Sequence, residues 1–425
     1  MRRKIELLIP AGSLEVLRVA VDYGADAVYI GGEAFGLRAK AHNFTMEEMK
    51  EGCDYCHTHG ARIYVTVNIF AHNADLPGVR AYLERLRDVP VDALIISDPA
   101  IFTMAREILP DMELHVSTQA NNTNYGIYQF WYRLGAKRVV SARELSLEEL
   151  KEIRANIPED MEIESFIHGA MCISYSGRCL LSNFLTGRDA NQGACTHPCR
   201  WKYSVVEEKR PGEYFPVEED DRGTYIFNSK DLCMIEHVPE LVNAGIDSFK
   251  IEGRMKTALY VATVARTYRK AIDDYLESEE KYRANLSYYK EEIGKCTYRQ
   301  FTTGFYFGKP DENTQIYDNN TYVNEYIYLG IVEAVKTAAK IWENIPEGLE
   351  AADDLCRIEQ RNKFCVGDMI EIMKPDGTNM PVIVEAMYTE EGGSVDSAPH
   401  PKQVLWIKTT GVPETYDLLR CENGK

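Results

Sequence analysis

Four of the chain's eleven cysteines lie in one short stretch, at Cys172, Cys179, Cys195 and Cys199. A fifth, Cys233, follows in the segment NSKDLCMIEH. The N-terminus, MRRKIELLIPAGS, has too short an apolar run for an export signal and is expected to be a first strand, so we expect a cytoplasmic protein. In that reducing compartment cysteines bind metal or do redox chemistry rather than form disulfides. This stretch is therefore the candidate centre of the protein's chemistry.

Two kinds of metal group suit these cysteines. A structural zinc site favours close ligand pairs, and only Cys195 and Cys199 form one, with His168 and His197 as further ligands. The wider spacing of Cys172 from Cys179 favours an iron–sulfur cluster, which takes thiolates from several loops. Zinc remains the alternative metal.

A second cysteine pair has a plainer interpretation. Cys53 and Cys56 lie one turn apart on an expected helix, followed by His57 and His59. One helical turn without further ligands is a weak metal site, so we interpret this pair as core packing.

Eight short runs rich in β-branched residues alternate with segments of helical periodicity, several of which open on Ser or Thr and close on Gly or Pro. The expected strands are residues 5–11, 27–32, 62–68, 93–98, 113–119, 138–143, 162–169 and 248–253. Eight βα units predict an α/β fold, a TIM-barrel-like (β/α)8 domain. A doubly wound sheet is the alternative, but the turn PAGSLEV after the first strand is a poor match to a phosphate-binding loop.

The C-terminal part of the chain has the periodicity of strands, with a turn signal, PDG, at 375–377. We predict a catalytic domain over 1–275, a helical and irregular connector over 276–320 and a small all-β barrel over 321–425. The cysteine-rich stretch is an insertion after the seventh strand, at about 171–235, on the barrel face that carries active sites.

The net charge of −18 excludes a protein that coats nucleic acid by charge alone. Any RNA contact is expected to use a local patch of about two to four phosphate contacts. No apolar run is long enough to cross a bilayer, so no membrane partner is expected. The acidic segment 206–223 is interpreted as a solvated loop.

The stretch ESFIHGAMCISYSGRCLLSNFLTGRDANQGACTHPCRWKY, followed by IFNSKDLCMIEHVPELVNAGIDSFKIEGRMK and YVATVARTYRKAID, resembles the signature of peptidase family U32, the collagenase-like proteases. The resemblance covers nearly the whole chain, including the part after Tyr322. It implies a TIM-barrel-like domain with a [4Fe–4S] cluster. By its length and its KDLC and KIEGRMK motifs, the chain is most similar to the tRNA uridine hydroxylases. These make 5-hydroxyuridine at the wobble position of the anticodon loop, with prephenate and without oxygen. Sister branches act on ribosomal RNA or a ubiquinone precursor.

The resemblance also implies the cluster ligands, which are Cys172, Cys179, Cys195 and Cys233. Cys199 is the alternative to Cys195, since the sequence alone does not separate the two. Cys233 is expected to begin a helix whose positive end helps to hold the cluster. Iron–sulfur assembly proteins are then expected partners.

Charged residues at strand ends are the candidates for catalysis. Lys250, Glu252 and Arg254 end the eighth strand, and His168 ends the seventh and can transfer a proton. Arg143 ends the sixth, and such cations suit a small dicarboxylate such as prephenate. Structural ion pairs are the alternative interpretation of these charges.

Further polar and aromatic residues are candidates for substrate binding. Asn68 and Gln119 end the third and fifth strands and offer hydrogen bonds. A uridine taken from a single-stranded loop needs aromatic faces for stacking. The insertion offers three such residues: Tyr175, Trp201 and Tyr203.

Three other functions remain open. A metallopeptidase would typically carry a His-Glu-x-x-His helix, which the sequence lacks, and a cysteine committed to iron is not free to attack a peptide. A non-catalytic assembly subunit would hold the cluster without forming product. A barrel enzyme of unrelated substrate with a structural zinc would hold one zinc and no labile sulfide.

Overall fold

The computed structural model describes residues 4–37, 43–171, 174–201, 204–205, 215–216, 228–309, 315–316 and 322–424. The chain forms two compact units. The first comprises Met1–Lys290 with Tyr298–Tyr322, and the second Glu291–Thr297 with Val323–Lys425. Among the described residues, no helix combines the length and the hydropathy of a membrane span.

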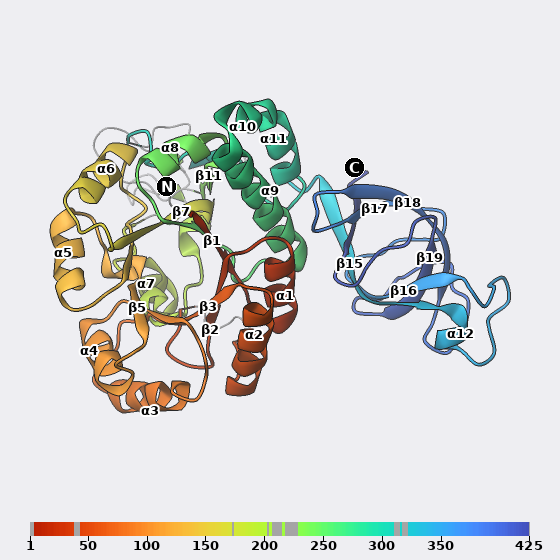
Figure 1. The fold of residues 1–425 in the computed structure, drawn as a ribbon, viewed down its shortest axis with the longest axis horizontal. Coiled ribbons are helices and arrows are strands. Elements are labelled where there is room, and N and C mark those ends of the chain that lie inside the picture. The colour runs from red at the N-terminus through yellow and green to blue at the C-terminus, as the bar shows by residue number, and fades with distance from the viewer. Residues whose placement is uncertain are drawn as a thin grey trace. The chain divides into compact units, whose positions relative to one another are not determined.

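Eight parallel strands form a closed barrel in the first unit (Figure 1). They are β1 (Glu6–Pro10), β2 (Ala27–Gly31), β3 (Arg62–Val67), β4 (Ala93–Ile96), β5 (Glu113–Val116), β6 (Arg138–Val140), β7 (Glu162–Ala170) and β12 (Ser248–Ile251). Strand β12 pairs in parallel with both β1 and β7, which closes the ring. All eight strands begin within a residue of the runs predicted from the sequence, and the predicted TIM-barrel-like fold is confirmed.

Helices surround these strands (Figure 1). They are α1 (Leu14–Asp22), α2 (Met46–Thr58), α3 (Leu76–Leu86), α4 (Pro99–Ile108), α5 (Tyr125–Arg133), α6 (Leu147–Ala155), α8 (Val238–Asn243) and α9 (Ala258–Glu277). Ser13, Thr45 and Ser146 cap α1, α2 and α6 with their side chains, as their positions in the sequence suggested. Two short helices, α10 (Glu279–Ala284) and α11 (Leu286–Gly294), follow α9.

The described part of the insertion between β7 and α8 consists of short elements. It contains α7 (Leu181–Thr186), two-residue strands β8 (Ser204–Val205), β9 (Phe215–Pro216) and β10 (Asn228–Ser229), and three single-turn 3-10 helices: η2 (Ala190–Gln192), η3 (Pro198–Arg200) and η4 (Ile235–His237). Strand β11 (Asp231–Cys233) pairs antiparallel with the end of β7 and parallel with β13 (Phe301–Thr302). Strand β14 (Gln315–Ile316) pairs with β10.

The prediction that Cys233 begins a helix is wrong, because Cys233 ends β11 and the next helical turn begins at Ile235. Strand β7 has nine residues, whereas its neighbour β6 has three and ends at Val140, opposite Glu164. The remaining edge of β7 offers unpaired backbone groups, and Asp231 to Cys233 satisfy them.

The second unit contains a closed antiparallel barrel with the strand order β15-β16-β19-β18-β17-β20. Its strands are β15 (Tyr326–Thr337), β16 (Asp354–Gln360), β17 (Met369–Met373), β18 (Asn379–Tyr388), β19 (Val404–Thr409) and β20 (Leu418–Glu422), with a short helix α12 (Ala338–Ile341). The predicted PDG turn joins β17 to β18, and Gly377 supplies its positive φ of 95°. The predicted small all-β barrel is confirmed.

Candidate active site

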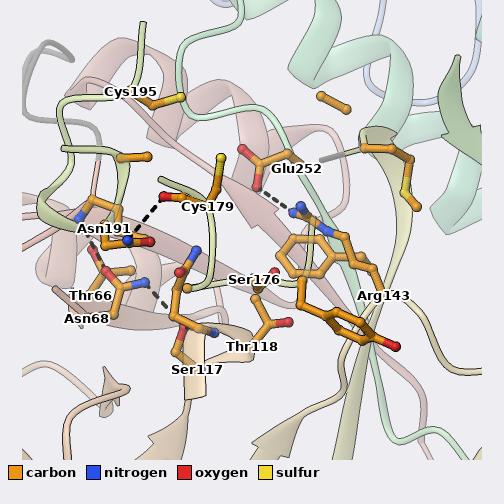
Figure 2. Close-up of a pocket in the computed structure, with 18 of the residues that line it drawn as sticks. Thr66, Asn68, Ser117, Thr118, Arg143, Ser176, Cys179, Asn191, Cys195 and Glu252 are labelled. Atoms are coloured by element: carbon orange, nitrogen blue, oxygen red, sulfur yellow. Dashed lines mark hydrogen bonds and ion pairs between the residues drawn. The ribbon is translucent and has the colours of Figure 1, made fainter. Parts of the chain in front are cut away.

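One cavity lies at the carboxyl ends of the barrel strands, where TIM-barrel sites occur (Figure 2). The barrel lines it with polar residues that end or follow strands, and the insertion supplies another wall. Its barrel residues include Thr66, Asn68, Ser117, Thr118, Gln119, Arg143, Phe166, Lys250, Glu252 and Arg254, and its insertion residues include Tyr175, Ser176, Cys179, Asn191, Cys195, His197 and Cys199. The barrel and the cysteine-rich insertion therefore build a single site.

Lys250 is held in the cavity by a buried ion pair. Its ammonium Nζ donates to Glu164 Oε1 at 2.6 Å, and both side chains are buried. The same ammonium lies over the rings of Tyr29, 4.4 Å from the centroid, and Phe166, at 5.4 Å. Ion pairing together with cation–π contact fixes this charge in one position.

Glu164 is shared between Lys250 and a charged network inside the barrel. Arg138 donates to Glu164 Oε2 at 3.2 Å, to Glu162 Oε2 at 2.6 Å and to Glu6 Oε2 at 3.2 Å. Burial alone would raise the pKa of Glu6, but Arg138 and hydrogen bonds from Tyr64 and Ser248 lower that pKa to about 2. The network thus positions Lys250 through Glu164, because one carboxylate oxygen of Glu164 accepts from Arg138 and the other accepts from Lys250.

Arg143 and Glu252 form a second ion pair, in the cavity wall (Figure 2). Arg143 Nη2 donates to Glu252 Oε2 at 3.2 Å, and its guanidinium stacks on Phe166 at 4.0 Å from the ring centroid. The ion-pair interpretation from the sequence therefore holds for Lys250 and Arg143. Both still line the cavity, so pairing orients them without removing them from it.

Arg254 reaches the cavity across the barrel. Its Nη1 donates to Thr66 Oγ1 at 2.9 Å, and Thr66 in turn donates to the carbonyl of Ile30 at 3.1 Å. Gly31 makes room for this guanidinium, because a Cβ at position 31 would collide with it. The guanidinium of Arg254, which follows β12, thus explains why glycine stands at position 31, at the end of β2.

Asn68 and Gln119 lie where the sequence placed them, in the cavity wall. Asn68 accepts from the backbone N–H of Leu37 at 3.2 Å and donates to Ser117 Oγ at 3.3 Å. Gln119 lies in the 3-10 helix η1 (Thr118–Ala120) after β5, which Ser117 caps. These groups offer amide donors and acceptors at one end of the cavity.

Three of the cysteines considered as cluster ligands also line the cavity, namely Cys179, Cys195 and Cys199. Asn191 Nδ2 donates to the carbonyl of Cys179 at 3.2 Å, and the backbone N–H of His197 donates to Cys195 Sγ at 3.4 Å (Figure 2 labels Cys179, Asn191 and Cys195). Only the second of these two hydrogen bonds reaches a sulfur, and a bond of that kind stabilises a ligating thiolate. The insertion therefore presents thiols to the cavity at three positions.

Cys172 lies outside the described residues and follows directly after Met171, which lines the cavity. Among the residues that the structure describes, no three His, Cys, Asp or Glu side chains are close enough to hold one metal ion. Cys53 and Cys56 are buried on α2, and burial raises the pKa of both thiols to about 12. That environment agrees with packing.

His168 and Cys233 are not among the residues that line the cavity. Their positions pair across β7 and β11, and both contact Tyr268 of α9, whose Oη is 3.4 Å from His168 Nδ1 and 3.8 Å from Cys233 Sγ. The register of β7 against β12 shifts between Lys250 and Ile251, so the alternation that brings Phe166 into the cavity does not continue to His168. Burial lowers the pKa of His168 to about 3 and raises that of Cys233 to about 11.

The aromatic candidates differ in position. Tyr175 lines the cavity and is half exposed. Trp201 is exposed after η3 and is not a cavity residue. Tyr203 lies outside the described residues.

Sequence reasoning missed several polar residues of the site, which are Thr66, Ser117, Thr118, Glu164 and Asn191. Two of the strand-end segments, YVTVN and HVSTQ, carried a signal, since each ends in consecutive or alternating polar residues. Glu164 had a signal too, because Glu162 and Glu164 alternate within an otherwise apolar strand.

Comparison with known proteins gives the family. The model of peptidase family U32 matches residues 12–316, and that of the peptidase family U32 C-terminal domain matches 346–420. The chain is 42% identical over 406 residues to "tRNA hydroxylation protein P1" of Bacillus subtilis (strain 168), covering 96% of this chain and 92% of the relative. It is 38% identical to "tRNA hydroxylation protein P" of Escherichia coli (strain K12), covering 98% and 95%. It is 35% identical to a "Collagenase" of Porphyromonas gingivalis, covering 72% and 74%. The chain therefore belongs to peptidase family U32, a family of enzymes.

Proposed function

We propose that this enzyme hydroxylates a uridine of tRNA in the cavity at the carboxyl ends of the barrel strands. The observation that carries the proposal is the similarity to the Bacillus subtilis tRNA hydroxylation protein, which extends over 96% of the chain and so includes both units. An enzyme that acts on tRNA works in the cytoplasm, which is the location we propose.

The finer assignment is conversion of the wobble uridine in the anticodon loop to 5-hydroxyuridine, with prephenate as co-substrate and without oxygen. The charges of the cavity support a dicarboxylate. Its described lining contains three cations and one carboxylate: Arg143, Lys250 and Arg254 with Glu252. Glu164 pairs with Lys250 but does not line the cavity. Arginine forks and a fixed ammonium are suited to binding two carboxylates.

A [4Fe–4S] cluster held by Cys172, Cys179, Cys195 and Cys233 is part of the proposal, with Cys199 as the alternative to Cys195. Support comes from the shared wall of Cys179, Cys195 and Cys199 and from the N–H donor to Cys195. Cys233 ends β11, which pairs with the end of β7 just before Cys172. Such a cluster supplies one-electron chemistry or binds a substrate oxygen, and it requires iron–sulfur assembly proteins as partners.

The protein's own side chains have distinct roles in this scheme. Glu252 is the carboxylate inside the cavity and is the group positioned to accept a proton from a substrate. Arg143 and Arg254 bind and orient the dicarboxylate. His168 packs against the rings of Tyr260, Tyr268 and Phe301 and is not a cavity residue, so we assign it to supporting β7 rather than to touching substrate.

Nucleoside mass spectrometry of tRNA and ribosomal RNA from a strain lacking the gene tests the proposal. We expect loss of a hydroxylated uridine from tRNA and its return when the wild-type gene is restored. Loss from ribosomal RNA alone would instead support the sister activity. If both RNAs are unchanged and the purified protein degrades gelatin, the chain is a peptidase.

A further inference from the structure

The insertion is rich in exposed apolar side chains. Fifteen large hydrophobic residues are exposed in the described part of the chain, and five of them lie in 174–201. They are Tyr175, Leu180, Phe184, Leu185 and Trp201. Phe184 is 85% exposed and Leu180 is 67% exposed, which is a large apolar area for a surface next to an active site.

The geometry of α7 explains why Leu180 and Phe184 face outward. Ser182 is buried, and its hydroxyl lies 3.0 Å from the hydroxyl of Thr196. The hydroxyl of Thr186 lies 3.2 Å from the hydroxyl of Thr196. These contacts fix the inner side of the helix against the cysteine loop. Leu180 and Phe184 are four residues apart, and the N–H of Phe184 donates to the carbonyl of Leu180 at 2.8 Å. They therefore share the opposite, outer side of α7.

This outer side adjoins the cavity. Cys179 lines the cavity and immediately precedes Leu180. Tyr175, four residues earlier, lines the cavity and is 50% exposed at the same time. The chain thus passes directly from the cavity wall at Cys179 to the exposed side of α7 at Leu180.

The net charge of residues 174–201 indicates which kind of ligand would bind to this surface. Residues 174–201 contain Arg178, Arg188 and Arg200 against one acidic residue, Asp189, so the segment has a charge of +2 in a chain of −18. Arg178 is exposed, and Asp189, which accepts from the N–H of Asn191 at 2.7 Å, lines the same small pocket as Arg178. Exposed aromatic faces beside cations, on an otherwise acidic protein, are the combination that binds single-stranded nucleic acid.

We propose that Leu180 and Phe184, together with Tyr175 and Arg178, form a docking surface for the single-stranded loop of the RNA substrate. Phe184 stacks on a nucleotide next to the target, Arg178 contacts a phosphate, and Tyr175 lies at the entrance through which the target base passes. This inference rests on the proposed function. It adds the surface that holds the RNA outside the cavity.

Binding of a fluorescent anticodon stem-loop to the full-length, anaerobically purified protein tests this surface. We expect Phe184→Ala to weaken binding roughly tenfold and Phe184→Trp to preserve it, because stacking is tolerant of ring type. Phe130→Ala is the matched control, since Phe130 is an exposed phenylalanine on α5, and it should bind as the wild type does. Arg178→Ala should reduce the salt slope of binding by about one, from a wild-type value of about two to four.

The outcomes distinguish failure of the docking surface from failure of the proposed function. If the wild type binds the stem-loop and Phe184→Ala binds equally well, the docking surface is wrong and tRNA hydroxylation stands. The surface is also wrong if the loss is the same for a blunt RNA duplex, or if Phe184→Ala abolishes binding to anionic vesicles or gelatin and leaves RNA binding intact. If the wild type binds no tRNA and the deletion strain keeps its hydroxylated uridine, both proposals fail. Circular dichroism and iron content show that each variant is folded.

Discussion

Lys250 and Glu164 form an ion pair inside the barrel, with 2.6 Å between Nζ and Oε1. The lysine belongs to β12 and faces the cavity, whereas the glutamate belongs to β7 and continues into the network around Arg138. A cation that lines the cavity is thus fixed by a carboxylate that does not line it.

Glu164→Gln should destabilise the protein by about 3 kcal/mol or more, because it leaves the buried Lys250 without its counter-charge. Urea denaturation measures the change. The double variant Glu164→Gln with Lys250→Met should recover part of the loss, since no buried ammonium remains. Glu162→Gln is the control, because Glu162 contacts Arg138 but is partly exposed and makes no described contact with Lys250. Equal losses for the two single variants would contradict this account.

The stability of the barrel should fall in acid through Glu6. Its pKa is about 2 in the folded protein and near 4.5 in the unfolded chain, so the unfolded chain binds more protons between these values. The contribution, on the order of 3 kcal/mol, is complete above about pH 4.5 and is lost as the pH falls toward 2. Unfolding free energies of wild type and Glu6→Gln, measured between pH 3 and 7, should converge toward low pH. A constant difference over that range would refute the assignment.

Substitution of single cysteines by serine should distinguish the cluster ligands from the other cysteines. Cys179→Ser, Cys195→Ser and Cys233→Ser are each expected to lower iron and acid-labile sulfide sharply, because a missing thiolate leaves an iron corner open. Cys199→Ser should leave both contents near the wild-type level, as should Cys365→Ser in the second unit. If Cys199→Ser loses iron and Cys195→Ser does not, the two exchange roles. Unchanged iron in Cys233→Ser would make Cys233 a core thiol beside Tyr268.

Gly31→Ala should act on catalysis through Arg254. The new methyl group would displace the guanidinium, which is the end of a flexible side chain, so the unfolding free energy should change little. The KM for the dicarboxylate should rise, and Arg254→Ala should raise it in the same way. Steady-state kinetics of the two variants and of their combination check this, and the combination should be no worse than Arg254→Ala alone. Additive increases in KM would show that Gly31 acts elsewhere.

The sequence predicted the strands because each carries a run of β-branched residues that a barrel buries on both sides. It also placed Lys250, Glu252, Arg254, Arg143, Asn68 and Gln119 in the cavity, since the carboxyl ends of parallel strands meet on one face. It could not predict β11, whose three residues pair only because β7 extends beyond β6. It could not predict the direction of His168 either, because that depends on a register shift between β7 and β12 rather than on local composition.

Mass spectrometry of anticodon fragments from individual tRNAs tests most directly whether this enzyme hydroxylates the wobble uridine. The tRNAs come from the deletion strain carrying the wild-type gene, Lys250→Met, or no gene. We expect hydroxylation at the wobble uridine with the wild-type gene only, since Lys250→Met removes the cation that the barrel network positions in the cavity. Equal wobble hydroxylation in all three strains would contradict it, whatever the iron content of the protein.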